Sequence, residues 1–268
     1  MKYWLEVLDW RSLAVLRRNA LVYLRNWRTA FFPPAMEPVV FFLAFGLGLQ
    51  GYVGELNYHG ATLSYATYVA PGLIAYTAFG TPFYESLYSA YVRMFYQKTW
   101  DGILATQVEL PHLVWGEILW AGVRGFMNSA IVCAVLAVFD LLGWVDLRLG
   151  WLPVLPFLGM LAGFCFSAFG LIFTAIVPSI DHMNYPVFLI GMPISLISNT
   201  YFPLEPKQAW LRTVMQLNPV YHLAETSRGL LVHGDPGGHL VWLIGCTSIG
   251  LLVFFSIAHH FTRRRMLG

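Results

Sequence analysis

Four charged side chains interrupt the apolar stretches of this 268-residue chain: Glu37, Glu85, Glu117 and Arg124. An unpaired charge inside a membrane costs several kcal/mol, so each needs a partner or water. Glu85 and Arg124 reach similar depth if their segments run antiparallel, because each lies about two helical turns from the loop that joins them. The sequence therefore predicts a Glu85–Arg124 ion pair, and the alternative is that each charge finds water or another side chain.

A stripe of hydroxyl and aromatic side chains follows the same segment as Glu85. On a helix the members of this stripe fall within an arc of about 80°. They are Thr77, Thr81, Tyr84, Tyr88 and Tyr91. Such a surface suits sugar rings and amphipathic lipid head groups, although tyrosines also hydrogen-bond between packed helices. A second polar group, Ser195, Ser198 and Asn199, could line an exit path or bond across helices in the same way.

Sequence signatures of enzymes are absent from the chain. It has no G-x-x-x-x-G-K-[ST] phosphate loop, no H-E-x-x-H zinc motif and no G-x-S-x-G nucleophile elbow. We therefore predict no catalytic residue, no metal site and no cofactor held by this chain. Its three cysteines, Cys133, Cys165 and Cys246, lie in apolar stretches without metal-ligand spacing and are expected to be small buried side chains.

The composition indicates that membrane helices position these residues. Hydrophobic residues make up 57% of the chain and charged residues only 11%. A soluble domain carries about 25% charged residues, and less than half of that cannot cover a water-facing surface. We expect an all-α polytopic membrane protein rather than the alternative, a soluble lipid-binding protein. The net charge of +2 indicates no nucleic acid partner.

Six apolar segments are each near the roughly 20 residues that cross a bilayer as a helix. They are predicted at residues 32–52, 66–93, 112–140, 151–178, 183–201 and 239–261. Together, residues 32–268 form the predicted transmembrane domain. Lysine and arginine are unequally distributed about it, with eleven in the terminal segments and the loop after the second span and four in the other connections. Since the richer side faces the cytoplasm, both termini are predicted to be cytoplasmic.

Residues 1–31 are predicted to form an amphipathic helix that lies on the cytoplasmic membrane surface. One face would be apolar, with Leu13, Leu16, Ala20, Leu24 and Trp27. The opposite face would be basic, with Arg11, Arg18 and Arg25. This pattern is typical of a helix whose apolar side enters the lipid while its arginines meet anionic head groups. Pro33 and Pro34 are expected to end the helix.

Two connections are long enough to hold helices of their own. In the cytoplasmic one, Thr99 is a candidate cap and Asp101 falls in the first turn. Trp100, Ile103 and Leu104 would form an apolar cluster there, either docking a protein partner or lying on the membrane.

The external connection, residues 201–238, is too short to cross twice and too apolar for an open loop. We predict an interfacial or re-entrant helical hairpin. An amphipathic turn begins at Trp210, and Asn218-Pro219 supplies a cap and first residue. Glu225 and Arg228 could pair on the polar side of that hairpin.

The sequence motifs of this hairpin resemble those before the last span of ABC-2 type exporter permeases. The residues that carry the resemblance are Tyr201-Phe202-Pro203-Leu204-Glu205-Pro206, Trp210-Leu211, Asn218-Pro219, Tyr221-His222, Glu225 and Arg228. Ala70-Pro71-Gly72-Leu73 and Phe83-Tyr84-Glu85-Ser86 resemble the subgroup that exports lipo-oligosaccharides, including rhizobial nodulation signals.

The resemblance implies a bacterial inner-membrane assembly of two copies of this chain and two of a separate ABC ATPase, which would bind ATP and Mg. Residues 98–107 would be the coupling helix that docks on the ATPase, although 94–107 carry fewer charges than in many relatives. The substrate would be a lipid-linked or oligosaccharide-type amphipath. A drug exporter permease, a membrane-embedded glycan or lipid enzyme, and an ATP-independent transporter are the alternatives.

Overall fold

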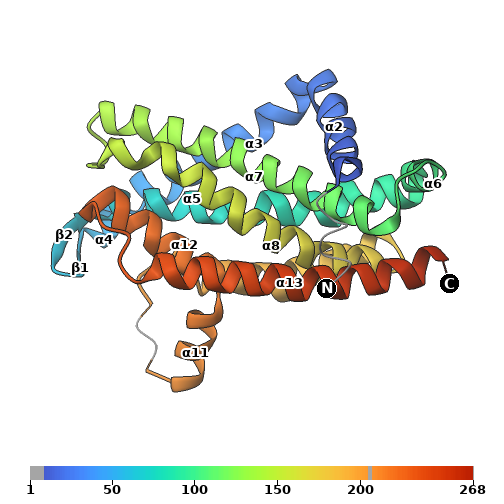
Figure 1. Cartoon of the computed structure of the whole chain (residues 1–268). Helices are drawn as coiled ribbons and strands as arrows, with labels where there is room; N and C mark the ends of the chain where they lie inside the picture. The colour runs from blue at the N-terminus through green and yellow to red at the C-terminus, as the bar shows by residue number, and fades with distance from the viewer. Residues whose placement is uncertain (1–8, 205–206, 268) are drawn as a thin grey trace.

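The computed structural model describes residues 9–204 and 207–267. Three residues used in the predictions lie outside these ranges: Lys2, Glu205 and Pro206. Most of the described chain is helical, and its long helices lie side by side along one direction (Figure 1). These are α5 (Tyr65–Tyr84), α7 (Leu110–Leu141), α8 (Leu155–Ile176) and α13 (His239–Leu267). Helix α8 lies at the centre and packs against α5, α7 and α13.

Four segments of the described chain are long and apolar enough to cross a membrane. They are Met36–Val53, Leu110–Leu141, Leu149–Ile176 and His239–Met266. Each overlaps a predicted span, and together they make the chain a polytopic helical membrane protein. Only 17% of the residues in the most apolar window of the last of them are buried within the chain, so this helix has surface left for lipid or another subunit.

The predicted spans at 66–93 and 183–201 do not meet the same length and hydropathy criteria. The first is helix α5, which continues without a break through the π-helical segments η2 (Glu85–Ser89) and η3 (Val92–Tyr96). Its polar stripe lowers its hydropathy. The second is divided into short elements: η5 (Ile180–Met183), α9 (Asn184–Pro186), η6 (Val187–Gly191) and α10 (Met192–Leu196). The six-span count therefore stays a prediction.

The prediction of an all-α fold is wrong at one place, where a β-hairpin follows α4 (Gln50–Val53). Strands β1 (Glu55–Tyr58) and β2 (Ala61–Ser64) pair antiparallel, with Tyr58 opposite Ala61. The two turn residues, His59 and Gly60, have φ angles of 48° and 81°. Two positive φ angles match the right-handed twist of paired strands, which is why a tight hairpin forms here.

The first predicted helix ends earlier than expected. Helix α2 (Trp10–Arg25) stops at Asn26, and α3 (Trp27–Phe41) begins at once and continues into η1 (Phe42–Leu47). Pro33 and Pro34 lie inside α3, so the prediction that they end the helix is wrong. Proline removes its own N–H donor, and membrane helices tolerate that loss where neighbouring groups satisfy the freed carbonyl groups.

Helix α2 packs on α7 through a face that the amphipathic pattern did not indicate. Its buried residues are Ser12, Val15, Asn19 and Tyr23. Val15 fits against Gly116 of α7, where a Cβ atom would lie 2.5 Å from the Cβ of Val15. The predicted apolar stripe points away from this contact, with Leu13, Leu24 and Trp27 exposed. The stripe thus remains free to enter lipid.

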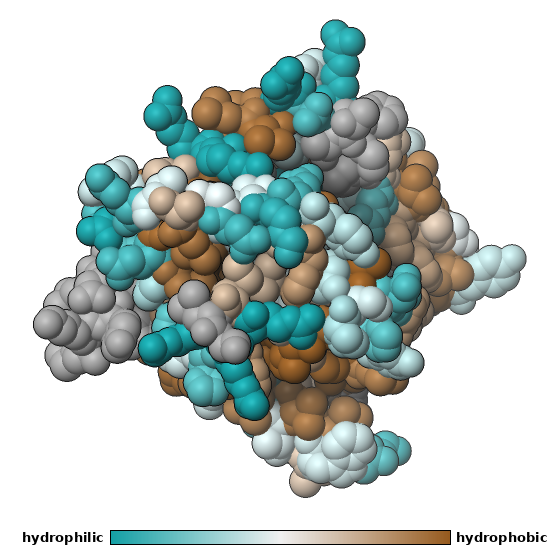
Figure 2. Space-filling view, turned by 90° about the vertical axis from the view of Figure 1, so that its right-hand side faces the viewer, coloured by the Kyte–Doolittle hydropathy of each residue, from teal (hydrophilic) through white to brown (hydrophobic). Residues whose placement is uncertain are grey.

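A short helix, α6 (Thr99–Leu104), lies at the same end of the molecule as the C-terminal end of α13 (Figure 1). The β-hairpin and the far end of α7 lie at the opposite end. Figure 2 looks onto the α6 end and shows hydrophilic residues gathered there, with apolar patches between them.

Glycines allow α7 and α8 to approach closely. A Cβ atom on Gly159 would lie 2.4 Å from the Ser129 hydroxyl, and one on Gly163 would lie 3.3 Å from Gly122 Cα. The G-x-x-x-G spacing therefore marks a close helix contact, as such motifs do in membranes. Pro82 of α5 enters the same crossing, 3.0 Å from a Cβ on Gly163.

Candidate functional site

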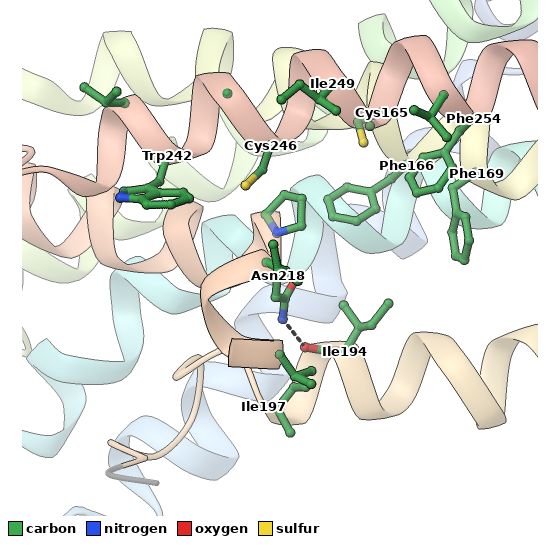
Figure 3. A pocket seen from close by; sticks show the side chains of 17 residues that line it. Cys165, Phe166, Phe169, Ile194, Ile197, Asn218, Trp242, Cys246, Ile249 and Phe254 are labelled. Carbon is green, nitrogen blue, oxygen red and sulfur yellow. Dashed lines mark hydrogen bonds between the residues drawn. The ribbon is translucent and has the colours of Figure 1, made fainter. Parts of the chain in front are cut away.

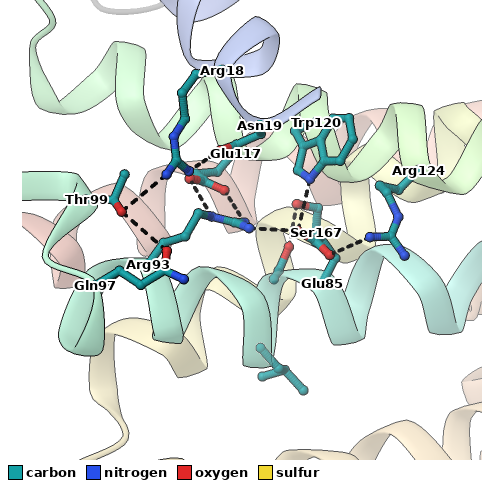
Figure 4. Close-up of polar contacts among 12 residues, drawn as sticks. Arg18, Asn19, Glu85, Arg93, Gln97, Thr99, Glu117, Trp120, Arg124 and Ser167 are labelled. Carbon is teal, nitrogen blue, oxygen red and sulfur yellow. Dashed lines mark hydrogen bonds and ion pairs between the residues drawn. The ribbon is translucent and has the colours of Figure 1, made fainter. Parts of the chain in front are cut away.

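A buried charge network lies between α5, α6 and α7, and Arg93 is its centre (Figure 4). Arg93 Nη1 lies 2.9 Å from Glu85 Oε1, while its Nε and Nη2 donate to the two carboxylate oxygens of Glu117 at 3.1 and 2.5 Å. All three residues are buried. Such bidentate, charge-assisted geometry is what offsets the cost of removing charges from water.

Trp100 joins the short helix α6 to this network. Its indole Nε1 donates to Glu117 Oε1 at 3.1 Å, and the side chain is 0% exposed. The prediction that Trp100 belongs to an exposed docking cluster is therefore wrong, because its hydrogen bond draws it inward. Thr99 is also not the cap, since Lys98 occupies that position with φ 53°. Asp101 does fall in the first turn, 3.9 Å from Lys98 Nζ.

The rest of the predicted docking cluster remains accessible. Ile103 and Leu104 are half-buried and pack beside Trp100, and Asp101 is exposed. Arg18 of α2 reaches the same helix, with its Nη2 3.4 Å from Thr99 Oγ1. Helices α2 and α6 are thus held together on the hydrophilic end of the molecule.

The predicted intramembrane pair is present. Arg124 Nη1 lies 3.1 Å from Glu85 Oε2, and Trp120 Nε1 donates to the other oxygen of that carboxylate at 3.0 Å. The guanidinium of Arg124 also lies over the ring of Tyr23 on α2, 4.7 Å from its centroid. Glu85 therefore accepts from Arg93, Arg124 and Trp120 at once.

Sequence reasoning missed the role of Arg93 and its bond to Glu117. A signal for it exists, since the one arginine in the helix of Glu117, Arg124, is already predicted to pair with Glu85, so Glu117 must take a cation from elsewhere. Arg93 is the next arginine along the chain from Glu85, and a long guanidinium side chain can serve two carboxylates.

A polar cavity of about 290 Å³ opens beside Glu85. Most of the predicted stripe lines it, together with one carboxylate of α3 and residues of α7. The lining residues are Glu37, Tyr76, Thr77, Gly80, Thr81, Tyr84, Glu85, Tyr88, Ser89, Arg124 and Asn128. Tyr91 is the exception: it is buried elsewhere, and its hydroxyl donates to the Pro178 carbonyl at 3.0 Å. The cavity thus brings together Glu37, Glu85 and Arg124, the charges singled out by the sequence.

The second predicted polar group lies away from this cavity. Ser195, Ser198 and Asn199 are buried. The Ser198 hydroxyl bonds to the Ser195 carbonyl and the Thr200 hydroxyl. Asn199 Nδ2 donates to Glu225 Oε1 of another helix at 3.4 Å, so part of the group bonds across helices, and the exit path stays a prediction.

Another buried ion pair lies toward the β-hairpin end, in α12 (Pro219–Arg228). Arg228 Nη1 lies 2.6 Å from Glu225 Oε1, as the spacing predicted, but both side chains are buried and not on a polar surface. Tyr58 of β1 donates to Glu225 Oε2 at 2.8 Å. Burial raises the pKa of the Tyr58 hydroxyl, which keeps it protonated and donating. Arg228 also donates to the Asn199 carbonyl at 2.8 Å.

The helices of residues 201–238 have different exposures. Helix α11 (Ala209–Leu217) is largely exposed, with Trp210 66% accessible, and Phe202 before it is also exposed while Pro203 is half-buried. In contrast α12, which continues into η7 (Gly229–His233), packs against α5 and α13. Asn218 caps α12 as predicted, accepting from the Val220 N–H at 3.0 Å, and Pro219 is the first residue. His222 is buried, and its Nε2 bonds to the Gln216 carbonyl.

An apolar groove of about 820 Å³ lies between α8, α13 and the shorter helices α10, α11 and α12 (Figure 3). Its walls include Phe166, Phe169, Trp242, Cys246, Ile249 and Phe254. Asn218 lies at its edge, but its amide donates to the Ile194 carbonyl at 2.9 Å. The groove therefore offers mainly apolar contact. Within the described residues, no three His, Cys, Asp or Glu side chains gather as metal ligands.

Comparison with known proteins identifies the class. The family model for ABC-2 type transporters matches residues 12–232, so the chain belongs to this family of transport membrane subunits. It is 28% identical over 260 residues to nodulation protein J of Rhizobium leguminosarum bv. trifolii, covering 97% of this chain and 95% of that protein. Nodulation protein J of Rhizobium meliloti strain 1021 is also 28% identical, covering 96% and 95%.

A further relative is named as a drug transporter. The probable multidrug ABC transporter permease YbhR of Escherichia coli K12 is 27% identical over 197 residues, which is 69% of this chain and 49% of that protein. The family resemblance read from the sequence motifs is thereby confirmed.

Proposed function

We propose that this chain is the permease subunit of an ATP-driven exporter that moves a lipid-linked or oligosaccharide-type amphipath out of the cytoplasm. Two copies would pair in the bacterial inner membrane, each with six spans and cytoplasmic termini. Two separate ABC ATPase subunits would bind ATP and Mg. The observation that carries this proposal is the tyrosine-lined polar cavity, joined through Glu85, Arg93 and Glu117 to α6.

The aromatic rings and hydroxyl groups that line the cavity favour an amphipathic substrate. Tyr76, Tyr84 and Tyr88 offer ring faces, and Thr77 and Thr81 offer hydroxyls. Aromatic faces beside hydrogen-bonding groups bind sugar rings, which present C–H and O–H surfaces in alternation. The nodulation protein J relatives favour the same substrate class.

The charge network supports a mechanism in which a separate ABC ATPase acts on the permease through α6. The ATPase can change the conformation of the permease only if it binds one conformation more tightly than another. The helix on which it docks must therefore contact helices that can rearrange. Trp100 attaches α6 to Glu117, and the same carboxylate holds Arg93. The motor-facing surface would be Asp101 with the half-buried Ile103 and Leu104.

Transport by the reconstituted pair tests this proposal. The chain, co-purified with its ABC ATPase, is placed in vesicles, and ATP-dependent movement of a fluorescent N-acyl oligosaccharide is measured. Tyr84→Leu removes a ring from the cavity wall and is expected to reduce transport. Tyr96→Leu is the matched control, because Tyr96 is 64% exposed and does not line the cavity. Equal movement without nucleotide would exclude the proposal.

A drug exporter permease is the second candidate. The apolar groove and the multidrug permease relative favour it, because a hydrophobic drug needs no polar head-group site. If transport of a dye without sugar is lost in Cys246→Trp, which fills the groove, and is unchanged in Tyr84→Leu, this candidate replaces the first.

A further inference from the structure

We infer that Glu37 makes the polar cavity a site for an ammonium group, so the head group of the substrate carries a positive charge. The inference rests on the proposed function and adds the charge of the substrate to it. Three observations carry it. Glu37 has no cation as a partner among the described residues, the neighbouring charges balance one another, and tyrosine rings line the same cavity.

Glu37 is one of four charged side chains within the apolar stretches, and the other three belong to the ion-pair network around Arg93. Glu37 lies in the segment Met36–Val53, which is long and apolar enough to cross a membrane. In the part of the chain that the structure describes, its carboxylate forms no ion pair and accepts one hydrogen bond, from the Tyr76 hydroxyl at 3.1 Å. A hydroxyl supplies no charge, and a carboxylate without a cation is costly inside a membrane. The position therefore calls for a cation from outside the chain.

A ligand can reach this carboxylate. Glu37 is exposed and lines the cavity, whereas Glu85 is 7% exposed and already accepts three hydrogen bonds. The Tyr76 hydroxyl bonds to Oε1 of Glu37, which leaves Oε2 for a ligand. Of the two carboxylates that line the cavity, Glu37 is therefore the one that can bind a new partner.

The network behind the cavity does not supply the missing cation, because its charges balance. It contains two carboxylates, Glu85 and Glu117, and two guanidinium groups, Arg93 and Arg124. Arg124 lines the cavity, but its Nη1 lies 3.1 Å from Glu85 Oε2, so its charge is already paired.

Arg18 does not change this balance at the cavity. It reaches the network from α2, where its Nη2 lies 3.4 Å from Thr99 Oγ1, and it does not line the cavity. It is half-buried at the hydrophilic end of the molecule, where water and salt screen its charge. Glu37 therefore leaves the cavity with one net negative charge, which attracts a cation strongly where the dielectric constant is low.

Tyrosine rings line the cavity together with Glu37, and they indicate which cation fits. They belong to Tyr76, Tyr84 and Tyr88. The face of an aromatic ring attracts a cation, and ammonium ligands are commonly recognised by several such rings. Ca²⁺ takes six to eight oxygen ligands, and Mg²⁺ needs a complete octahedral set. One free carboxylate beside three rings therefore suits an ammonium group better than a metal ion.

Binding to the full chain in nanodiscs of a zwitterionic lipid tests the inference with two probes that share one alkyl chain and one dye. One probe ends in a trimethylammonium group, and the other ends in a tert-butyl group of the same shape without the charge. The measured quantity is the ratio of the two affinities, compared between variants, because partition into the lipid is then the same. Glu37→Gln keeps an acceptor for Tyr76 and removes the charge. It is expected to lower the preference for the ammonium probe about tenfold.

Glu55→Gln is the matched control. Glu55 is an exposed carboxylate of β1 and does not line the cavity, so this change removes the same charge from the protein away from the site. The affinity ratio is expected to stay that of the parent protein. Tyr84→Leu removes a ring but no charge, and it is expected to lower the ratio about threefold.

Several outcomes would overturn the inference. An unchanged ratio in Glu37→Gln means that the carboxylate is protonated in the membrane or is paired with a second copy of the chain. An equal fall in Glu55→Gln means that the overall charge of the protein attracts the probe. If Glu37→Gln does not fold, an unchanged ratio in Tyr84→Leu has the same consequence.

The test also separates this inference from the proposed function. ATP-driven transport with no preference for the ammonium probe contradicts the inference alone. Preferential binding of the ammonium probe without ATP-driven transport contradicts the proposed function alone.

Discussion

Residues 9–204 and 207–267 contain two buried ion-pair networks, one toward the β-hairpin and one toward α6, and they are built differently. At the β-hairpin end, Arg228 binds Glu225 and the Asn199 carbonyl, and Tyr58 donates to the other oxygen of Glu225. At the α6 end, Arg93 is shared by two carboxylates. The second opens into the polar cavity through Glu85 and Arg124.

The difference indicates what each network does. Arg228 and Glu225 join α12 to backbone carbonyls and to the β-hairpin, so the contacts fix one arrangement of the outer elements. In the second network, Glu85 has two cations and Arg93 two anions, so one partner can be exchanged for another without leaving a charge alone. A network of that kind can rearrange, which the proposed motor-driven change requires.

Arg228→Leu is expected to have the largest effect on stability. It leaves Glu225 buried without its cation, which costs about 3 to 5 kcal/mol. The thermal midpoint of the purified protein should fall steeply. Adding Glu225→Gln removes the isolated charge and should restore much of the midpoint. If Arg228→Leu leaves the thermal midpoint unchanged but abolishes transport, the Arg228–Glu225 network takes part in the conformational change. The proposed difference between the two networks would then be wrong.

Trp100→Phe and Tyr58→Phe form a matched pair with smaller effects. Each removes one hydrogen bond to a buried carboxylate, Glu117 in one case and Glu225 in the other. Both should lower stability by about 1.5 to 3 kcal/mol, the usual contribution of a bond to a charged group. Only Trp100→Phe should uncouple ATP hydrolysis from transport, because Trp100 alone lies in α6. Transport per ATP hydrolysed, compared between the two variants, decides this.

The sequence predicts well those features that depend on one element or one strict constraint. Asn218 caps α12, and Glu225 pairs with Arg228, because spacing along one helix determines both. The Glu85–Arg124 pair follows from the cost of a lone charge in the membrane.

Features that depend on which face meets a neighbour were missed. Trp100 completes an apolar cluster on a short helix, and nothing in that pattern reveals that Glu117 of another helix accepts from its indole. The face of α2 that packs on α7 was missed for the same reason, because it depends on the space that Gly116 of α7 leaves for Val15.

Asp101→Asn is expected to have the smallest effect on stability. Its effect on ATPase binding can therefore be measured separately from any effect on folding. Asp101 and Lys98 are both largely exposed and 3.9 Å apart, and exposed pairs of this kind contribute little. The thermal midpoint should therefore stay within error of the parent protein. Co-purification with the ABC ATPase should nevertheless weaken, and weaken further at high salt, because an exposed charge acts through screened attraction.

Lys207→Gln, which changes an exposed charge in the connection of residues 201–238, is the control and should leave co-purification unchanged. If the double variant Asp101→Asn/Ile103→Glu binds the ATPase normally, α6 is held in place by Trp100 but is not the surface on which the ATPase docks.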